Sequence, residues 1–245
     1  MTNSKRRRNS LITGILFVLA IGLLLFSTVT GARAALILNA NPYQTNMELL
    51  NTSLRIVEKY SKDAAPLYLD NGGALLTKMV GANEAVTPGT KYFEQASVNN
   101  NGDVDSVIRV QIYRYWTDGK GNKLTDVDPD LIKLNGMDTP LEGWVKGEVD
   151  TPERTVLYCT TVIPAGGETP IFCDGLTISS DVLKQVIQDP PVNGTIVTHF
   201  YYEGMQFNVE VEADSVQARH GTEAAKSAWG ASLTVDEDAG TVSLG

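Results

Sequence analysis

The chain has 245 residues, of which 42% are hydrophobic and 20% charged, and its formal net charge is −9. This length supports one substantial core or at most two small domains. The composition, with 22 glycines and 10 prolines, excludes a collagen, a coiled coil and a fully disordered chain, and the frequent turns favour β structure.

Charge is unevenly distributed along the chain. The first 34 residues hold five basic residues and no acidic one, so the remainder carries 15 basic against 29 acidic residues, a net charge of −14. A body this acidic repels nucleic acids and anionic membranes, and we expect it to bind neither. The charge has two interpretations: it keeps a secreted surface soluble, or it recruits divalent cations.

The N-terminus has the pattern of an export signal. Four basic residues at 5–8 precede an apolar run at 11–29, and the small residues Ala32 and Ala34 follow it. This pattern predicts a signal peptide helix over residues 1–34, cut between Ala34 and Ala35. The apolar run also approaches the roughly 20 residues that span a bilayer, so an uncleaved anchor is the alternative. Either way, residues 35–245 are expected to form a single domain outside the cytoplasm.

The body of the chain alternates short β-type segments with turns. In residues 107–116, Ile108, Val110 and Ile112 are expected to face a core while the residues between them face outward. Strands are predicted at 46–58, 91–98, 107–116, 131–134, near 144, 155–163, 171–178, 195–202 and 206–216, and short helices at 180–188 and 222–229. The sequence therefore predicts an all-β, mostly antiparallel, jelly-roll-like β-sandwich with one or two short helices.

Cys159 and Cys173 are the two cysteines of the chain. A hairpin folded about Gly166 would place them opposite each other on neighbouring strands, close enough for a disulfide bond. The sequence thus predicts a structural disulfide. Two free buried thiols are the alternative, while a metal site lacks further cysteines and a neighbouring histidine.

Catalytic motifs are absent from the sequence. It contains no Gly-x-Ser-x-Gly, no phosphate-binding glycine loop and no His-Glu-x-x-His. His199 with Glu203, or His220 with Glu223, would need further ligands to hold zinc, and the sequence indicates none. We therefore predict no catalytic residue and no enzyme activity.

A group of acidic residues offers the one candidate cation site. Its carboxylates would suit calcium, although a leucine stands where the helix-loop-helix calcium motif requires glycine. The alternative is a set of solvated turn residues shaped by Pro129. The candidate calcium ligands are Asp118, Asp126, Asp128 and Asp130.

Several short segments form a recognisable pattern when they are taken in chain order. They are Val86-Thr-Pro-Gly89, Ser97-Val-Asn-Asn-Asn-Gly102, Val107-Ile-Arg-Val110, Tyr115-Trp116, residues 118–130, Arg154-Thr-Val-Leu-Tyr158, Gly204-Met-Gln-Phe207, residues 211–217 and Ala225-Lys-Ser-Ala-Trp-Gly230. Together these segments resemble the TasA/camelysin family of secreted bacterial matrix proteins, in its SipW-dependent branch found in Firmicutes. The leader ending in Thr-Gly-Ala-Arg-Ala-Ala35 is similar to signals cut by the SipW-type signal peptidase.

This resemblance implies a jelly-roll sandwich that is exported and assembles into extracellular biofilm-matrix fibres. It also implies that the mature N-terminus, Ala35, Leu36, Ile37 and Leu38, acts as a donor strand that completes a sheet of the next subunit, which is β-augmentation in physical terms. The alternative for these residues is an ordinary first strand within their own sheet.

The implied partners are copies of the same chain, a SipW-type signal peptidase and other matrix proteins, with membrane contact only through the leader. The implied location is the extracellular matrix or cell surface. Camelysin-like members are described as metallopeptidases, so a cell-surface metallopeptidase is an alternative function, and a monomeric cell-surface adhesin is another.

Overall fold

The computed structural model describes residues 53–76, 78, 86–148, 151–190 and 198–245, all within one compact unit, Leu50–Gly245. The predicted leader, the cleavage site at Ala34 and Ala35, and the donor strand at 35–38 lie outside the described residues. In the part that is described, no helix has the length and apolarity needed to cross a membrane.

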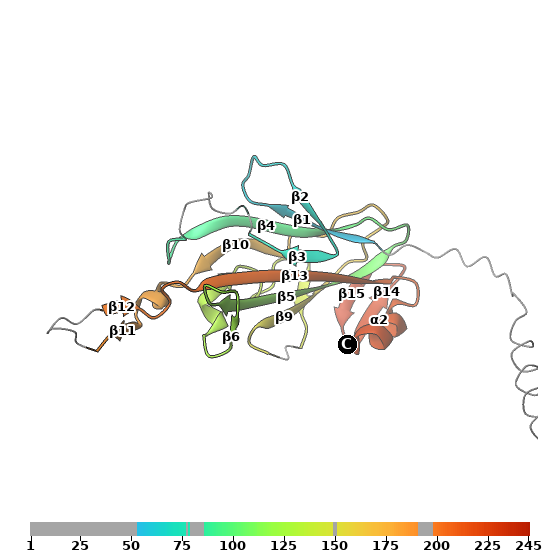
Figure 1. Ribbon diagram of the computed structural model, residues 1–245. Coiled ribbons are helices and arrows are strands. Elements are labelled where there is room, and N and C mark those ends of the chain that lie inside the picture. Colours follow the sequence, from blue (N-terminus) through green and yellow to red (C-terminus); the bar gives the residue numbers. More distant parts are fainter. Residues whose placement is uncertain (1–52, 77, 79–85, 149–150, 191–197) are drawn as a thin grey trace, which may run out of the picture. The chain divides into compact units, whose positions relative to one another are not determined.

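Two antiparallel sheets form the body of the unit (Figure 1). The first sheet has the order β2-β1-β4-β10-β7 and the second the order β3-β13-β5-β9-β8, with β6 paired to β5. The strands of the first sheet are β1 Leu54–Lys59, β2 Leu67–Asp70, β4 Lys91–Asn100, β7 Ile132–Leu134 and β10 Cys173–Ile178. Those of the second are β3 Gly72–Ala74, β5 Ser106–Thr117, β6 Lys123–Leu124, β8 Trp144–Lys146, β9 Arg154–Cys159 and β13 Gln206–Gln217.

The main core lies between these sheets. Ile56 of β1 and Val98 of β4 pack in one hydrophobic cluster with Ile108 and Ile112 of β5, and all four are fully buried. Burying one face of each sheet in this way is what the period-2 alternation predicts. The structure thus confirms the all-β sandwich and the inward side of the strand predicted at 107–116.

A smaller layer covers part of the outer face of the second sheet. It consists of α2 Gly221–Trp229 and the hairpin of β14 Leu233–Asp236 with β15 Thr241–Leu244, and it has its own buried cluster. The helix ends where Gly230 takes a left-handed conformation, φ 68°, and its N–H donates to the Lys226 carbonyl. Glycine tolerates that conformation at a helix end, so the prediction of a helix over 222–229 is confirmed.

The predicted helix over residues 180–188 is wrong. Only a 3₁₀ turn forms, η2 Ser180–Leu183, started by the Ser179 hydroxyl accepting from the Asp181 N–H. The chain then extends into β11 Val186–Gln188, which pairs with β12 Thr198–Phe200. Val186 and Ile187 are β-branched, and their side chains fit a strand better than a helix.

The predicted cysteine hairpin is also wrong. Cys159 ends β9 in the second sheet, whereas Cys173 begins β10 in the first, and both thiols are free and buried. The intervening segment takes its hydrogen bonds from β4 instead of β9, because the N–H groups of Gly166, Thr169 and Phe172 donate to carbonyls of that strand. A crossover between sheets therefore replaces the hairpin, and the predicted disulfide is absent from this structure.

Candidate assembly surface

A two-stranded ribbon stands apart from both sheets. Among the described residues, β11 and β12 pair only with each other, in the register Val186↔Phe200, Ile187↔His199 and Gln188↔Thr198. We call residues 180–190 and 198–203 the arm. Figure 1 shows β11 and β12 beyond the end of β13 that the chain enters first.

The arm exposes large apolar side chains. Leu183, Val186, Ile187 and Phe200 are 46%, 54%, 39% and 47% exposed, and they are four of the six large hydrophobic residues that are exposed in the described parts of the chain. A lone two-stranded ribbon is marginally stable in water, and its unpaired edges are templates for further strands. Exposed apolar side chains gathered in this way mark an interaction surface.

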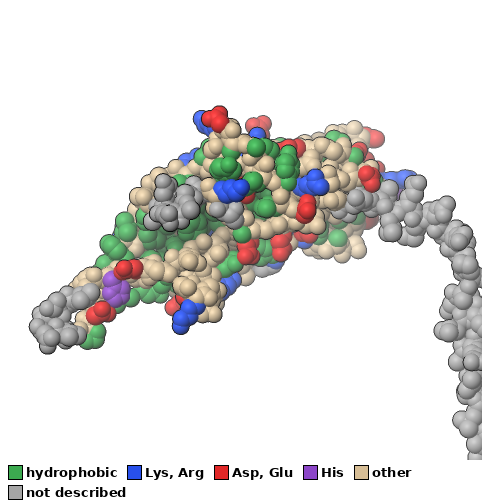
Figure 2. All heavy atoms as spheres, turned by 45° about the horizontal axis from the view of Figure 1, so that its top comes forward, with side chains coloured by type: hydrophobic (Ala, Val, Ile, Leu, Met, Phe, Trp, Pro, Cys, Tyr) green, Lys and Arg blue, Asp and Glu red, His purple; other side chains and the backbone are tan. Residues whose placement is uncertain are grey.

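The arm is also acidic. Asp181, Asp189 and Glu203 outnumber its one lysine, Lys184, and Figure 2 shows acidic, histidine and hydrophobic side chains together on it. Lys184 forms an ion pair with Asp181 at 2.5 Å. That hydrogen-bonded partner lowers the pKa of Asp181.

An aromatic cluster fixes the arm to the sandwich. The rings of Tyr201 and Tyr202 meet edge to face at 5.1 Å between centroids, and Tyr202 lies 5.4 Å from Trp116 of β5. The indole N–H of Trp116 donates to the Asp128 carbonyl. Packing of this kind stabilises the root of the arm while its strands stay exposed.

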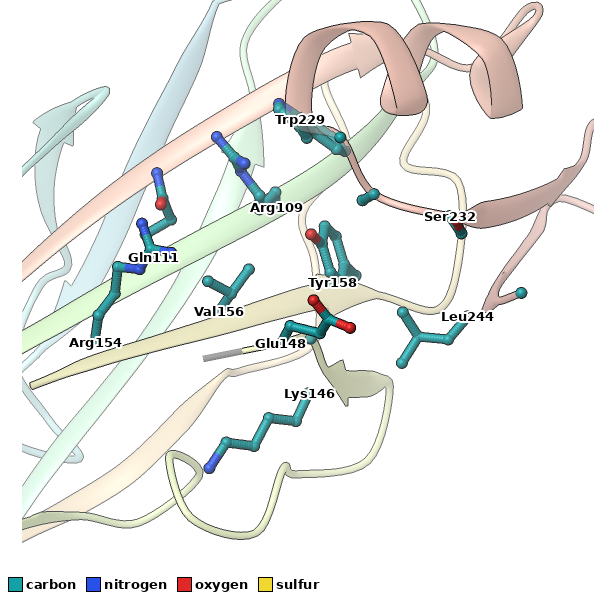
Figure 3. Close-up of a pocket in the computed structure, with 14 residues that line it drawn as sticks. Arg109, Gln111, Lys146, Glu148, Arg154, Val156, Tyr158, Trp229, Ser232 and Leu244 are labelled. Atoms are coloured by element: carbon teal, nitrogen blue, oxygen red, sulfur yellow. The ribbon is translucent and has the colours of Figure 1, made fainter. Parts of the chain in front are cut away.

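A groove lies on the outer face of the second sheet, where the C-terminal layer meets it. Its volume is about 610 Å³, and its walls come from β5, β8, β9, the end of α2 and β15. Figure 3 shows Arg109, Gln111 and Arg154 in a row along the strands, with Trp229 beyond Arg109 and Leu244 on the far side of Tyr158. Leu244 is 45% exposed, so the rim of the groove is a second place where the chain presents a large apolar side chain.

Arg109 is held rigidly in this groove. Its guanidinium lies 4.9 Å from the centroid of the Trp229 ring and donates to Oδ2 of Asp214 at 2.6 Å. Gln111, only 8% exposed, donates to the same oxygen, and the Tyr158 ring lies 5.9 Å from that of Trp229. These contacts preorganise a basic and aromatic wall.

The structure does not bring the four predicted calcium ligands together. Asp118 accepts from the backbone N–H groups of Lys120 and Asn122 and from the Asn122 side chain, and the Asn122 bonds lower its pKa. Asp128 accepts from the Asp130 N–H. Asp130 itself pairs with Arg114, while Asp126 is exposed. Within the described ranges, no group of three or more His, Cys, Asp or Glu is placed to hold a metal ion.

The two histidines contact other groups than the glutamates considered with them as zinc ligands. His199 of β12 lies 3.8 Å from Asp189, across the arm. His220 precedes α2 in a left-handed conformation, and its N–H donates to Glu237. The pairs His199 with Glu203 and His220 with Glu223 thus gain no further ligand from the described structure.

Two carboxyl groups inside the sandwich were missed by the sequence reasoning. Glu58 of β1 and Glu94 of β4 are 1% and 0% exposed. Oε1 of Glu58 accepts from the Leu76 N–H, and the protonated Glu94 carboxyl is hydrogen-bonded to that of Glu58. Burial, and next the neighbouring Glu58, raise the pKa of Glu94 to about 9. The sequence pattern could have revealed them, because each glutamate occupies an inward-facing position in the period-2 alternation of its strand.

Tyr68 of β2 is 59% exposed, and the other large apolar side chains that are exposed in the described residues belong to the arm and the groove. They come from segments far apart in the sequence, and they differ in charge and shape. No protein-family model, no curated protein and no solved structure matches this chain.

Proposed function

We propose that this chain is the structural subunit of an extracellular fibre and that it assembles head to tail with copies of itself. The observation that carries the proposal is the arm, an apolar two-stranded ribbon with open edges. A protein that works as a monomer gains nothing from exposing Val186, Ile187 and Phe200 to water, whereas a subunit buries them at a contact.

The arm and the rim of the groove favour a filament over a closed dimer. The arm and the rim of the groove at Leu244 are different surfaces. A contact between unlike surfaces is heterologous, and it leaves one free surface at each end of every oligomer. Such contacts extend into open fibres unless the rotation between subunits closes a ring.

The export pattern at the N-terminus supports the location and supplies a donor strand. Cleavage by a SipW-type signal peptidase between Ala34 and Ala35 would leave the apolar residues Leu36, Ile37 and Leu38 at the start of the mature chain. Such a segment gains backbone hydrogen bonds and burial by joining a free sheet edge of the next subunit. In the described structure the two large sheets end in β2, β7, β3 and β8.

The experiment compares chains that begin at Ala35 and at Pro42. Both are examined by negative-stain electron microscopy after concentration, with matched circular dichroism spectra as the control for folding. Fibres from the longer chain alone are expected. Fibres of equal length and number from both chains would refute the donor strand, and folded monomers from both would refute the fibre subunit itself.

A further inference from the structure

We propose that the groove is the receptor for the arm of a second copy of this chain. This inference rests on the self-assembly proposed above and names the two surfaces that meet. Four observations carry it: the charges of the two surfaces, their apolar side chains, their separation along β13, and the rigidity of the groove.

The charges of the two surfaces are complementary. The groove is lined by Arg109, Lys146 and Arg154 and by the carboxylate of Glu148. Asp214, which binds Arg109, lies beside the groove. These cations come from three different strands of a chain whose net charge is −9. The arm contributes the opposite sign, with three acidic residues and one lysine. A basic recess in an acidic molecule selects an acidic partner and steers its approach.

Lys146 is the groove cation best placed to reach a partner. Its side chain is half-buried at the end of β8 and makes no ion pair with any residue that the structure describes. On the arm, Asp189 is about half exposed, and its one ion-pair partner among the described residues is His199, at 3.8 Å. These two groups can therefore form a new ion pair without breaking a strong existing one.

Apolar side chains accompany the charges on both surfaces. Val186, Ile187 and Phe200 stand exposed on the arm, and the groove offers Val156, the rings of Tyr158 and Trp229, and the exposed Leu244. Aromatic and aliphatic side chains around a partly polar recess are the usual composition of a contact centre. The arm thus matches the groove in apolar character as well as in sign of charge.

The placement of the two surfaces prevents a copy from filling its own groove. The arm ends just before Gln206, the first residue of β13, whereas the groove residues Arg109 and Gln111 pair with Asp214 and Glu212 in the second half of that strand. The six to eight residues from Gln206 to these partners span ~20–27 Å. The arm and groove therefore lie toward opposite ends of β13, as Figure 1 also shows for β11 and α2. Each copy keeps one free arm and one free groove, which is the condition for a linear polymer.

The groove is preorganised for this contact. Arg109 is fixed between Trp229 and Asp214, and Tyr158 packs on the same indole ring. A receptor whose side chains are already held in place loses little conformational entropy when its ligand arrives. The arm, fixed at its root by Tyr202 and Trp116, is similarly positioned.

The test uses charge reversal in protein purified from the medium of cells that express the full chain. Lys146→Glu in the groove and Asp189→Lys on the arm are made singly and together. Lys226→Glu and Asp103→Lys, at exposed positions outside both surfaces, change the net charge equally and serve as matched controls. Circular dichroism and thermal unfolding confirm that every variant is folded.

Each single reversal is expected to raise the critical concentration for polymerisation at least about tenfold relative to its control, because it places like charges in contact. The double variant, in which the charges are again opposite, is expected to recover most of this loss. Single variants that polymerise like their controls would overturn the arm and groove contact and leave the fibre proposal standing. Wild-type protein that stays monomeric would overturn both.

A second measurement locates the contact directly. Zero-length coupling of carboxylates to amines in the wild-type polymer, followed by mass spectrometry, is expected to link Lys146 to Asp181, Asp189 or Glu203 of another copy. Mixing isotope-labelled with unlabelled chains separates links between copies from links within one. Links between copies that join other surfaces and leave Lys146 uncoupled would contradict the proposal.

Discussion

The carboxyl group of Glu94 lies beside that of Glu58 within the sandwich, and burial together with this neighbour raises the pKa of Glu94 to about 9. The two acidic groups come from neighbouring strands of one sheet and share an interior from which water is excluded, so Glu94 keeps its proton at neutral pH. This arrangement links the stability of the sandwich to pH.

Stability is predicted to fall as pH rises. The folded state keeps the Glu94 proton up to about pH 9, whereas the unfolded chain releases it near the usual glutamate pKa of 4.5. The contribution of Glu94 to the free energy of unfolding is therefore largest below pH 4.5, decreases between pH 4.5 and about pH 9, and is absent above pH 9. The slope of this decrease is up to about 1.4 kcal/mol per pH unit. Urea unfolding at several pH values between 4.5 and about 9 measures this slope.

The substitution Glu94→Gln tests whether Glu94 causes this pH dependence of stability. The amide keeps the shape of the side chain without the charge, so the variant is expected to lose the slope and to exceed wild type in stability at alkaline pH. Glu212→Gln, at an exposed position of β13, is the matched control and should keep the slope. An unchanged slope in Glu94→Gln would show that another group causes the pH dependence.

Both cysteines are predicted to carry free thiols that react only after unfolding. They are fully buried, and desolvation raises the pKa of each thiol, with Glu94 adding to the rise at Cys173. Alkylation followed by mass spectrometry should therefore find no modified cysteine in the native protein and two in denaturant without reductant. Thiols that appear only after reduction would restore the disulfide that the crossover between sheets argues against.

Leu233 and Leu244 face each other across β14 and β15, and we predict that Leu233 serves stability whereas Leu244 serves assembly. Leu233 is 2% exposed within the C-terminal layer, and its partner Leu244 is 45% exposed at the groove. Leu233→Ala is expected to lower the free energy of unfolding by about 2–5 kcal/mol because it leaves a cavity. Leu244→Ala should cost less than about 1 kcal/mol and should impair polymerisation instead. Equal destabilisation by the two changes, measured by urea unfolding, would contradict this division.

The exposed side chains of the arm are predicted to serve assembly and not folding. Val186→Thr and Phe200→Thr keep strand-compatible side chains while removing apolar surface. We expect the free energy of unfolding to change by less than about 0.5 kcal/mol and light scattering at fixed concentration to fall. The buried Val211→Thr, on β13, is the comparison that should lose stability. An arm variant that polymerises normally would remove the arm from the contact.

Local alternation was enough to predict the sandwich. The strand at 206–216 alternates buried Val209, Val211 and Ala213 with exposed Glu210 and Glu212, as predicted from period 2. Sequence reasoning failed where the outcome depends on distant partners. Residues 180–188 suit either a helix or a strand, and pairing with β12 decides between them.

The candidate site could not be predicted from the sequence for the same reason, because its contacts join distant parts of the chain. The groove joins Arg109 and Asp214, which are 105 positions apart, so no spacing within the sequence could indicate their contact. Only the structure shows that the strands of the arm pair with each other alone in the described part of the chain. Cys159 and Cys173 were placed on one hairpin because the crossover through residues 160–172 leaves no local signal.

Sedimentation velocity of the protein released by cells that express the full chain, over a wide range of concentrations and followed by electron microscopy, tests self-assembly most directly. The account predicts large, concentration-dependent species that appear as open fibres and weaken as salt screens the charges of arm and groove. A single folded monomer at every concentration would contradict it.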